Sequence, residues 1–252
     1  MENSIDPISL FKQTNFSKTL WWRLKVNISG YQNETENNLV TEIIKNRIFK
    51  LIYPNSFQHS IKLSRILVQF FEDGYICWID INKLIIEKYE LEKDISVLYD
   101  YNLIKEKIPL ILDWIRTKSK LKNRYLWGGT LGPNFDCSGL IQTAFLTHKI
   151  YIPRDSYQIK NFCKKLFNFK ENRNSLKEGD LLFFGNKETC NHVGIHIGNG
   201  FYYHSSGNDF GRNGIGIDTI NDTDDKISLH YQTKLISAGR VIRGYRWDRT
   251  IR

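Results

Sequence analysis

One cysteine lies where a glycine-rich loop is followed by a helix-like pattern. The stretch NRYLWGGTLGPNFDCSGLIQ covers residues 123–142 and places Cys137 directly after Asp136. Aspartate is a preferred N-cap residue, so we expect Cys137 to be the first residue of a helix. A helix N-terminus stabilises a thiolate, the reactive form of cysteine, through unpaired N–H groups and the helix dipole. The pattern indicates a nucleophile, and a buried inert cysteine is the alternative that the stretch alone leaves open.

A catalytic cysteine needs a general base, and the segment HVGIHIGNGFYYHSSG (192–207) supplies two candidates. If residues 198–200 form a three-residue hairpin loop, His192 and His204 share one sheet face as diagonal neighbours on adjacent strands, with roughly 7–8 Å between their backbones. A two-residue loop would place them on opposite faces. We therefore predict the three-residue loop. The opposite, buried face of the first strand then holds Val193, Ile195 and Ile197.

The other histidines are weaker candidates. His196 shares a face with His192 but lies nearer the turn. His59, His148 and His230 have no chemical partner in their sequence context, and we interpret them as structural.

Zinc binding is an alternative use of the same side chains. Cys137, Cys190, His192 and His204 are possible ligands, but Cys190-x-His192 is their one short ligand spacing. Zinc would also occupy the nucleophile, so we expect neither a metal nor another cofactor.

The composition is that of a globular protein. The chain has 252 residues, of which 41% are hydrophobic and 25% are charged. A net charge of +9 could attract nucleic acid, anionic lipid or an acidic polymer, but the basic residues are dispersed, which favours a basic surface without a nucleic-acid or membrane partner. The sequence has no signal-peptide pattern and no apolar run of membrane-spanning length, so we expect the protein to stay in the cytoplasm unless an unconventional route exports it. We also expect a monomer. The four cysteines form no CxxC pair, which favours free thiols in a reducing compartment.

The first third of the chain has the pattern of short strands. Residues 20–29 alternate between apolar and polar side chains, which predicts one half-buried strand. Further strand-like runs cover 47–53, 65–71 and 75–81, with the turn residues EDG between the last two. Several short strands in about seventy residues favour a small barrel.

The rest of the chain mixes helices and strands. Residues 104–120 have helical periodicity, and we expect Pro109 in the first turn of a helix that connects two domains. The helix that carries Cys137 is followed by a buried strand in KEGDLLFFG, the hairpin with the two histidines, and a late strand in SAGRVIRGY. This order predicts an α+β arrangement.

Several ordered blocks of the second half together resemble a known family. YLWGG, DCSGL, IPRDSYQ, EGDLLFFG and HVGIHIGNGFYYHSSG are similar to the NlpC-type family of papain-like cysteine peptidases, from about Tyr125 to Val241. The resemblance implies Cys137 as nucleophile, His192 as general base and His204 as the residue that orients the base. It also implies an oxyanion hole formed by the backbone N–H of Cys137 and the hydroxyl of Tyr125. A core aromatic with a satisfied hydroxyl is the alternative for Tyr125.

The first domain carries a looser resemblance. With FFEDGYICWI at its end, it is similar to the bacterial SH3-like barrel that precedes the catalytic domain in cyanobacterial γ-D-glutamyl-L-diamino acid endopeptidases. This implies hydrolysis of the bond between D-Glu and the diamino acid in peptidoglycan stem peptides with a free N-terminal L-Ala, in cell-wall recycling. The predicted domains are a lead-in (1–18), an SH3-like barrel (19–91), a linker with a helix (92–118) and an NlpC-type peptidase domain (119–252).

Such a substrate needs acidic groups to hold its ammonium group. Asp73 and Tyr75 of the barrel and Asp155 of the peptidase domain are candidates. A turn role for Asp73 and an ion pair between Arg154 and Asp155 are the structural alternatives. The further candidate cleft residues are Asp136, Ser138, Arg154 and Ser156.

Three other functions remain open at this point. They are an exported lysin that cuts intact wall, an acyltransferase or amidase on the same catalytic layout, and a wall-binding module with an inactive site. The missing signal sequence argues against the first of these, and the complete set of Cys137, His192 and His204 argues against the last.

Overall fold

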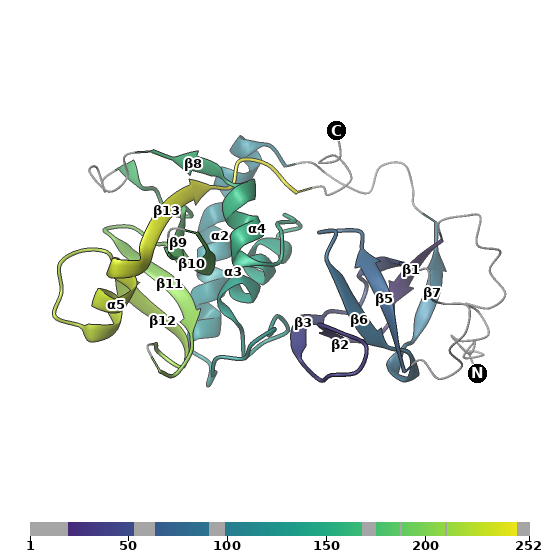
Figure 1. Cartoon of the computed structure of the whole chain (residues 1–252). Helices are drawn as coiled ribbons and strands as arrows, with labels where there is room; N and C mark the ends of the chain where they lie inside the picture. The colour runs from purple at the N-terminus through teal and green to yellow at the C-terminus, as the bar shows by residue number, and fades with distance from the viewer. Residues whose placement is uncertain are drawn as a thin grey trace. The chain divides into compact units, whose positions relative to one another are not determined.

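The computed structural model divides the chain into two compact units, Met1–Ser96 with Arg246–Arg252, and Val97–Tyr245 (Figure 1). It describes residues 20–52, 64–90, 99–167, 175–186, 188–209 and 211–245. Three predicted features lie outside these residues. They are the lead-in, the part of the linker before residue 99, and His59.

The first unit is an antiparallel sheet of seven strands in the order β3-β2-β6-β5-β4-β1-β7. The edge strands β3 and β7 do not pair with each other within the described residues, so the sheet is not a closed barrel there. The elements are β1 (Trp21–Leu24), β2 (Ile28–Tyr31), β3 (Leu39–Ile43), β4 (Ile48–Leu51), β5 (Arg65–Phe70), β6 (Ile76–Asp80), the 3-10 helix η1 (Ile81–Lys83) and β7 (Ile86–Tyr89).

The single strand predicted for residues 20–29 is wrong. The chain turns at residues 25–27 and forms two strands, β1 and β2, that lie far apart in the strand order of the sheet. The alternation nevertheless has the expected effect, because Trp22, Leu24 and Ile28 are all buried in the core of this unit. Alternation marks which side chains point inward and does not reveal where a strand bends.

The second unit is an α+β structure with a six-stranded antiparallel sheet in the order β12-β11-β10-β9-β13-β8. Its helices are α2 (Tyr101–Ser119), α3 (Cys137–Leu146), α4 (Ser156–Phe162) and α5 (Lys226–Lys234). Its strands are β8 (Lys164–Leu166), β9 (Leu181–Gly185), β10 (Cys190–His196), β11 (Phe201–Ser206), β12 (Gly214–Thr219) and β13 (Leu235–Arg240).

This sheet has a hydrophobic core on each face. Alternate residues of β10 and β11, such as Val193, Ile195 and Tyr203, pack in the core that also contains apolar residues of α2, α3 and α4. Tyr202 belongs to a second core with Tyr231 of α5. Figure 1 shows α2, α3 and α4 gathered together and α5 apart from them. The residues on β10 and β11 therefore reach two different environments according to their position in the strand.

Helix α2 differs from the prediction in two ways. It is part of the second unit's core through Ile104, Ile111 and Ile115, instead of standing between domains. It also begins at Tyr101, where Asp100 accepts a hydrogen bond from the N–H of Leu103, so Pro109 lies inside the helix and not in its first turn. The N-cap aspartate starts the helix before the apolar periodicity that the prediction relied on.

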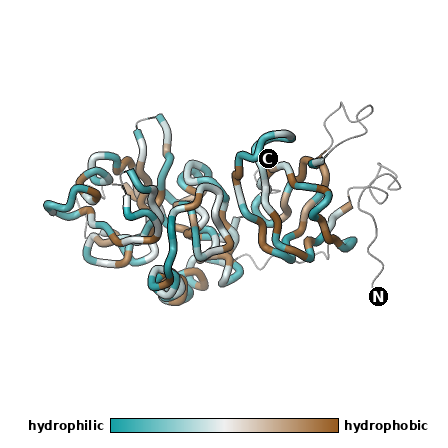
Figure 2. The backbone as a smooth tube through the Cα atoms, turned by 90° about the horizontal axis from the view of Figure 1, so that it is seen from below, coloured by the Kyte–Doolittle hydropathy of each residue, from teal (hydrophilic) through white to brown (hydrophobic). Residues whose placement is uncertain are grey.

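Apolar and polar segments alternate along the backbone of each unit (Figure 2). Among the described helices, none combines the length and the hydropathy that crossing a membrane requires.

Candidate active site

Cys137 begins helix α3, as the sequence predicts. A carboxylate oxygen of Asp136 accepts a hydrogen bond from the N–H of Gly139 at 2.6 Å and caps the helix. The helix start lies close to the preceding loop, because a Cβ on Gly139 would be 2.1 Å from the carbonyl oxygen of Gly129. Only glycine fits at this position, so the loop and the N-cap together fix the place of the cysteine.

The capping carboxylate is held by a buried arginine. Arg154, 2% exposed, donates to both oxygens of Asp136 at 3.1 and 2.5 Å and to the hydroxyl of Ser138 at 2.9 Å. Asp136 also accepts from the N–H of Gly128 at 2.9 Å. The structure thus shows an ion pair between Arg154 and Asp136. The alternative pair of Arg154 with Asp155 stays a prediction.

The thiol of Cys137 is protonated in this environment. Burial and the neighbouring Asp136 raise its pKa to about 12, against the opposing effects of the Val193 N–H and Arg154. The sulfur donates to the carbonyl of Asn191 with 3.9 Å between Sγ and O, so it lies beside the backbone that leads into His192. The helix N-terminus does not outweigh burial, and the thiolate expected from the sequence requires a base.

The hairpin that carries the histidines has the predicted register. Ile195 faces Tyr203 and the N–H of Ile197 donates to the carbonyl of Phe201 at 2.9 Å, which leaves residues 198–200 as a three-residue loop. All three loop residues have positive φ, including Asn199 at 52°. The three-residue loop is confirmed, and it places the two histidines on one face.

The two histidines form a chain of hydrogen bonds that ends on a carboxylate. Nε2 of His192 lies 2.8 Å from Nδ1 of His204, and Nε2 of His204 lies 2.5 Å from Oδ2 of Asp218 on β12. The side chains of His204 and Asp218 are fully buried. The sequence analysis missed Asp218. Its signal was the acidic residue in the strand-like run GIGID, but the seven residues between β11 and β12 left the register of that strand undetermined.

The surroundings of the two hydrogen-bonded histidines keep both of them neutral. Burial and the neighbouring His204 lower the pKa of His192 well below 6.5, and burial also lowers the pKa of His204. Burial raises the pKa of Asp218, but hydrogen bonds from His204, Arg212 and Ser228 outweigh it and lower the value to about 2. A carboxylate and two neutral imidazoles are therefore present at neutral pH.

A tyrosine that the sequence analysis missed covers the histidine pair. The ring of Tyr231 on α5 stacks on His192 with 4.7 Å between centroids and meets His204 edge to face at 4.7 Å. Burial and the neighbouring Cys137 raise the pKa of Tyr231 to about 12, against the opposing effect of a hydrogen bond with Ser206. Tyr231 thus lies near both the thiol and the base. The local sequence SLHYQTK carries no signal for this role.

The structure also brings Tyr125 near the cysteine. Tyr125 bridges to Phe135 in the segment before the helix, and burial together with the neighbouring Cys137 raises the pKa of its hydroxyl.

Among the other described histidines, His196 supports the hairpin loop. His196 lies 3.0 Å from the carbonyl of Lys177 through Nδ1, and its Nε2 accepts from the N–H of Gly200 at 3.2 Å, which holds the hairpin loop. His148 follows the end of α3, and the ring of His230 lies edge to face with Tyr231.

The candidate substrate-binding residues belong to both units of the chain. Asp73 is in the first unit, where it accepts from Arg47 at 2.6 Å and from the N–H of Tyr75 at 3.0 Å. Asp155 and Ser156 are at the start of α4, and Ser156 donates to the carbonyl of Cys190 at 3.2 Å. Asp136, Ser138 and Arg154 form the buried network beside Cys137.

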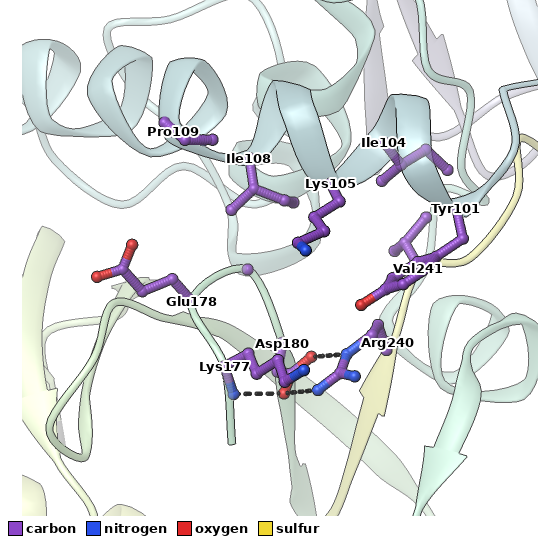
Figure 3. A pocket seen from close by; sticks show the side chains of 11 residues that line it. Tyr101, Ile104, Lys105, Ile108, Pro109, Lys177, Glu178, Asp180, Arg240 and Val241 are labelled. Atoms are coloured by element: carbon purple, nitrogen blue, oxygen red, sulfur yellow. Dashed lines mark hydrogen bonds and ion pairs between the residues drawn. The ribbon is translucent and has the colours of Figure 1, made fainter. Parts of the chain in front are cut away.

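A hollow of about 330 Å³ lies between α2, the turn at 177–180 and the end of β13 (Figure 3). Its polar floor is an internal pair, in which Arg240 donates to Asp180 at 2.6 and 2.8 Å. The backbone N–H of Lys177 also donates to Asp180. The residues that line it include neither cysteine nor histidine, so it is no alternative centre for thiol chemistry.

Comparison with known families agrees with this geometry. Residues 122–233 match the model of the NlpC/P60 family. The match lies within the second unit and covers less than half of the chain.

Individual relatives align with parts of the chain. A γ-D-glutamyl-L-lysine dipeptidyl-peptidase of Bacillus cereus is 40% identical over 102 residues, 38% of this chain and 29% of the relative. A probable endopeptidase NlpC homolog of Haemophilus influenzae is 35% identical over 115 residues, 45% of this chain and 51% of the relative. The murein DD-endopeptidase/LD-carboxypeptidase MepS of Escherichia coli is 36% identical over 84 residues, 33% of this chain and 42% of the relative. The chain thus spans about half or less of the length of these curated relatives.

Among solved structures, an NlpC/P60 family protein from Bacillus cereus is 22% identical, with a TM-score of 0.43. The match covers 89% of this chain and 64% of that one.

Proposed function

We propose that the second unit is a cysteine peptidase that hydrolyses the bond between D-Glu and the diamino acid in peptidoglycan stem peptides. The observation that carries this proposal is the combination of a thiol at a capped helix start with a buried base chain that ends on Asp218. The sequence resemblance and the relatives named for γ-D-glutamyl-L-lysine and murein peptide bonds supply the substrate class.

The reaction runs through an acyl-enzyme. His192 accepts the thiol proton, and the sulfur of Cys137 attacks the side-chain carbonyl carbon of D-Glu. The carbon–nitrogen bond then breaks, and the protonated imidazole returns its proton to the leaving amine of the diamino acid. Water, deprotonated by the same imidazole, hydrolyses the thioester and restores the thiol. The N–H of Cys137 and the hydroxyl of Tyr125 stabilise the oxyanion.

The proposal also covers which peptides enter the site and in which compartment the reaction takes place. We take the first unit as SH3-like. We infer that the substrate has a free N-terminal L-Ala, and Asp155 is the candidate partner of its ammonium group. We place the reaction in cell-wall recycling in the cytoplasm, with a free muropeptide as substrate.

A direct test compares substrates and variants of the full chain. We expect hydrolysis of L-Ala-γ-D-Glu-diaminopimelate and its lysine analogue by the wild type, no hydrolysis by Cys137→Ala, and unchanged hydrolysis by Cys163→Ala. Cys163 is a matched control because it is also a buried free thiol, at the end of α4. Mass spectrometry of the products identifies the broken bond.

Several outcomes would contradict the proposal. Cleavage of crosslinked D-Ala bonds alone, or transfer of the acyl group to an added amine without hydrolysis, would replace it by another reaction at the same cysteine. Equal activity on intact sacculi and on the free peptide would remove the proposed restriction of access and favour an exported lysin.

A further inference from the structure

The carboxylate at the end of the histidine chain determines where every proton in that chain lies. An ionised carboxylate only accepts hydrogen bonds, so Nε2 of His204, 2.5 Å from Asp218, carries a proton. A neutral His204 then has a bare Nδ1, which accepts from Nε2 of His192 at 2.8 Å. Since His192 is also neutral, its Nδ1 is left without a proton.

We propose that Asp218 is a positioning residue that fixes the tautomers of both histidines and so makes Nδ1 of His192 the atom that accepts the Cys137 proton. The catalytic role of the Cys137–His192 pair rests on the proposed function, whereas the tautomers themselves do not. Asp218 touches neither the thiol nor the substrate and acts only through His204.

Asp218 is also bound through its other carboxylate oxygen, the one that does not contact His204. Its Oδ1 accepts from Arg212 at 2.5 Å and from the hydroxyl of Ser228 at 2.8 Å. Arg212 also donates to Asp225 at 2.6 Å, and Asp225 caps α5. Three segments, β12, the 211–213 loop and α5, thus orient one carboxylate, which leaves Oδ2 for the histidine.

The charged and titratable neighbours of this chain agree with the assignment. Asp218 raises the pKa of both histidines, while Arg212 lowers that of His204 and His230 lowers that of His192. The rings of Tyr202 and Tyr231 lie against His204, and Asp225 shares Arg212 with Asp218. Among these described groups Asp218 is the acceptor in contact with a ring nitrogen.

The substitution Asp218→Asn separates charge and acceptor function from shape. The Asn amide can donate to Nε2 of His204, which would move the His204 proton to Nδ1 and reverse the hydrogen bond to His192. Nδ1 of His192 would then carry the proton and could not act as base. We expect kcat on the stem peptide to fall about 100-fold or more, with KM changed less than about twofold.

A matched control isolates this effect. Asp225→Asn alters the other carboxylate bound by Arg212 and keeps a side chain that can cap α5. We expect its kcat to stay within about twofold of the wild type. Alkylation of Cys137 by iodoacetamide at pH 7, read by peptide mapping, should slow in Asp218→Asn and not in Asp225→Asn. This readout requires no substrate.

The decisive measurement uses the unsubstituted chain. Long-range ¹H–¹⁵N correlation spectra of the ¹⁵N-labelled protein report which ring nitrogen carries each proton, and single His→Gln variants assign the signals. We expect His192 and His204 both to be neutral and protonated on Nε2. A proton on Nδ1 of either residue would overturn the proposal, even if Asp218→Asn fails to fold.

The two proposals can fail separately. Wild-type hydrolysis that is unchanged in a folded Asp218→Asn variant would refute the positioning role and leave the peptidase intact. The predicted tautomers and alkylation rates, without hydrolysis of any stem peptide, would refute the proposed substrate and leave Asp218 as the residue that sets the base.

Discussion

Each unit contains a buried arginine bound to carboxylates, and the two differ in what they hold. In the first unit Arg47 contacts Glu72 at 3.2 Å and Asp73 at 2.6 Å, and Glu72 also accepts from the N–H of Ile48. In the second unit Arg154 contacts Asp136, the residue before the proposed nucleophile Cys137. The same kind of interaction fixes a turn between two strands in one unit and the start of the helix that carries Cys137 in the other. Buried ion pairs therefore identify rigid positions, and the neighbouring residue types decide whether chemistry occurs there.

Removing each arginine should destabilise both units but affect the thiol of Cys137 in only one case. Each of the substitutions Arg47→Met and Arg154→Met leaves at least one buried carboxylate without its arginine partner. We therefore expect each to lower the free energy of unfolding by about 3–5 kcal/mol. Only Arg154→Met should also slow alkylation of Cys137, because it frees the N-cap carboxylate beside the thiol. Denaturant unfolding and peptide-mapped alkylation measure the two effects. Slowed alkylation in folded Arg47→Met would contradict the distinction between the units.

The pH dependence of activity should also distinguish the two units, because the second unit contains the proposed base His192. The pKa of His192 is lowered well below 6.5, so kcat/KM should decline only when the pH falls through that low value and protonates the base. The thiol pKa is about 12, so kcat/KM should stay flat from pH 7 to about pH 10. A steady decline in kcat/KM between pH 7 and about pH 9 would instead indicate a preformed thiolate–imidazolium pair.

Local signals were sufficient for part of the site. Asp136 before Cys137 predicted the start of α3, and the GNG loop with its parity predicted that His192 and His204 share a face. Both features depend on residues that are close in sequence. The α+β character of the second unit also followed from the order of its patterns.

The rest of the site depends on contacts between distant segments. Asp218 and Tyr231 reach the histidines through the β11–β12 register and the packing of α5, which no local pattern encodes. The thiol pKa depends on burial, so the helix N-terminus alone gave the wrong direction. In the first unit alternation predicted the buried face but neither the break between β1 and β2 nor whether the sheet closes.

In the proposed reaction Cys137 forms the acyl-enzyme after His192 has accepted its proton. An L-Ala-γ-D-Glu analogue that carries a diazomethyl ketone in place of the scissile amide tests it, with intact-mass and peptide-mapping analysis. We expect one adduct per chain on Cys137, and a labelling rate reduced at least about 100-fold in His192→Ala. Labelling of Cys190 instead, or equal labelling of Cys137 in the wild type and in His192→Ala, would contradict the account.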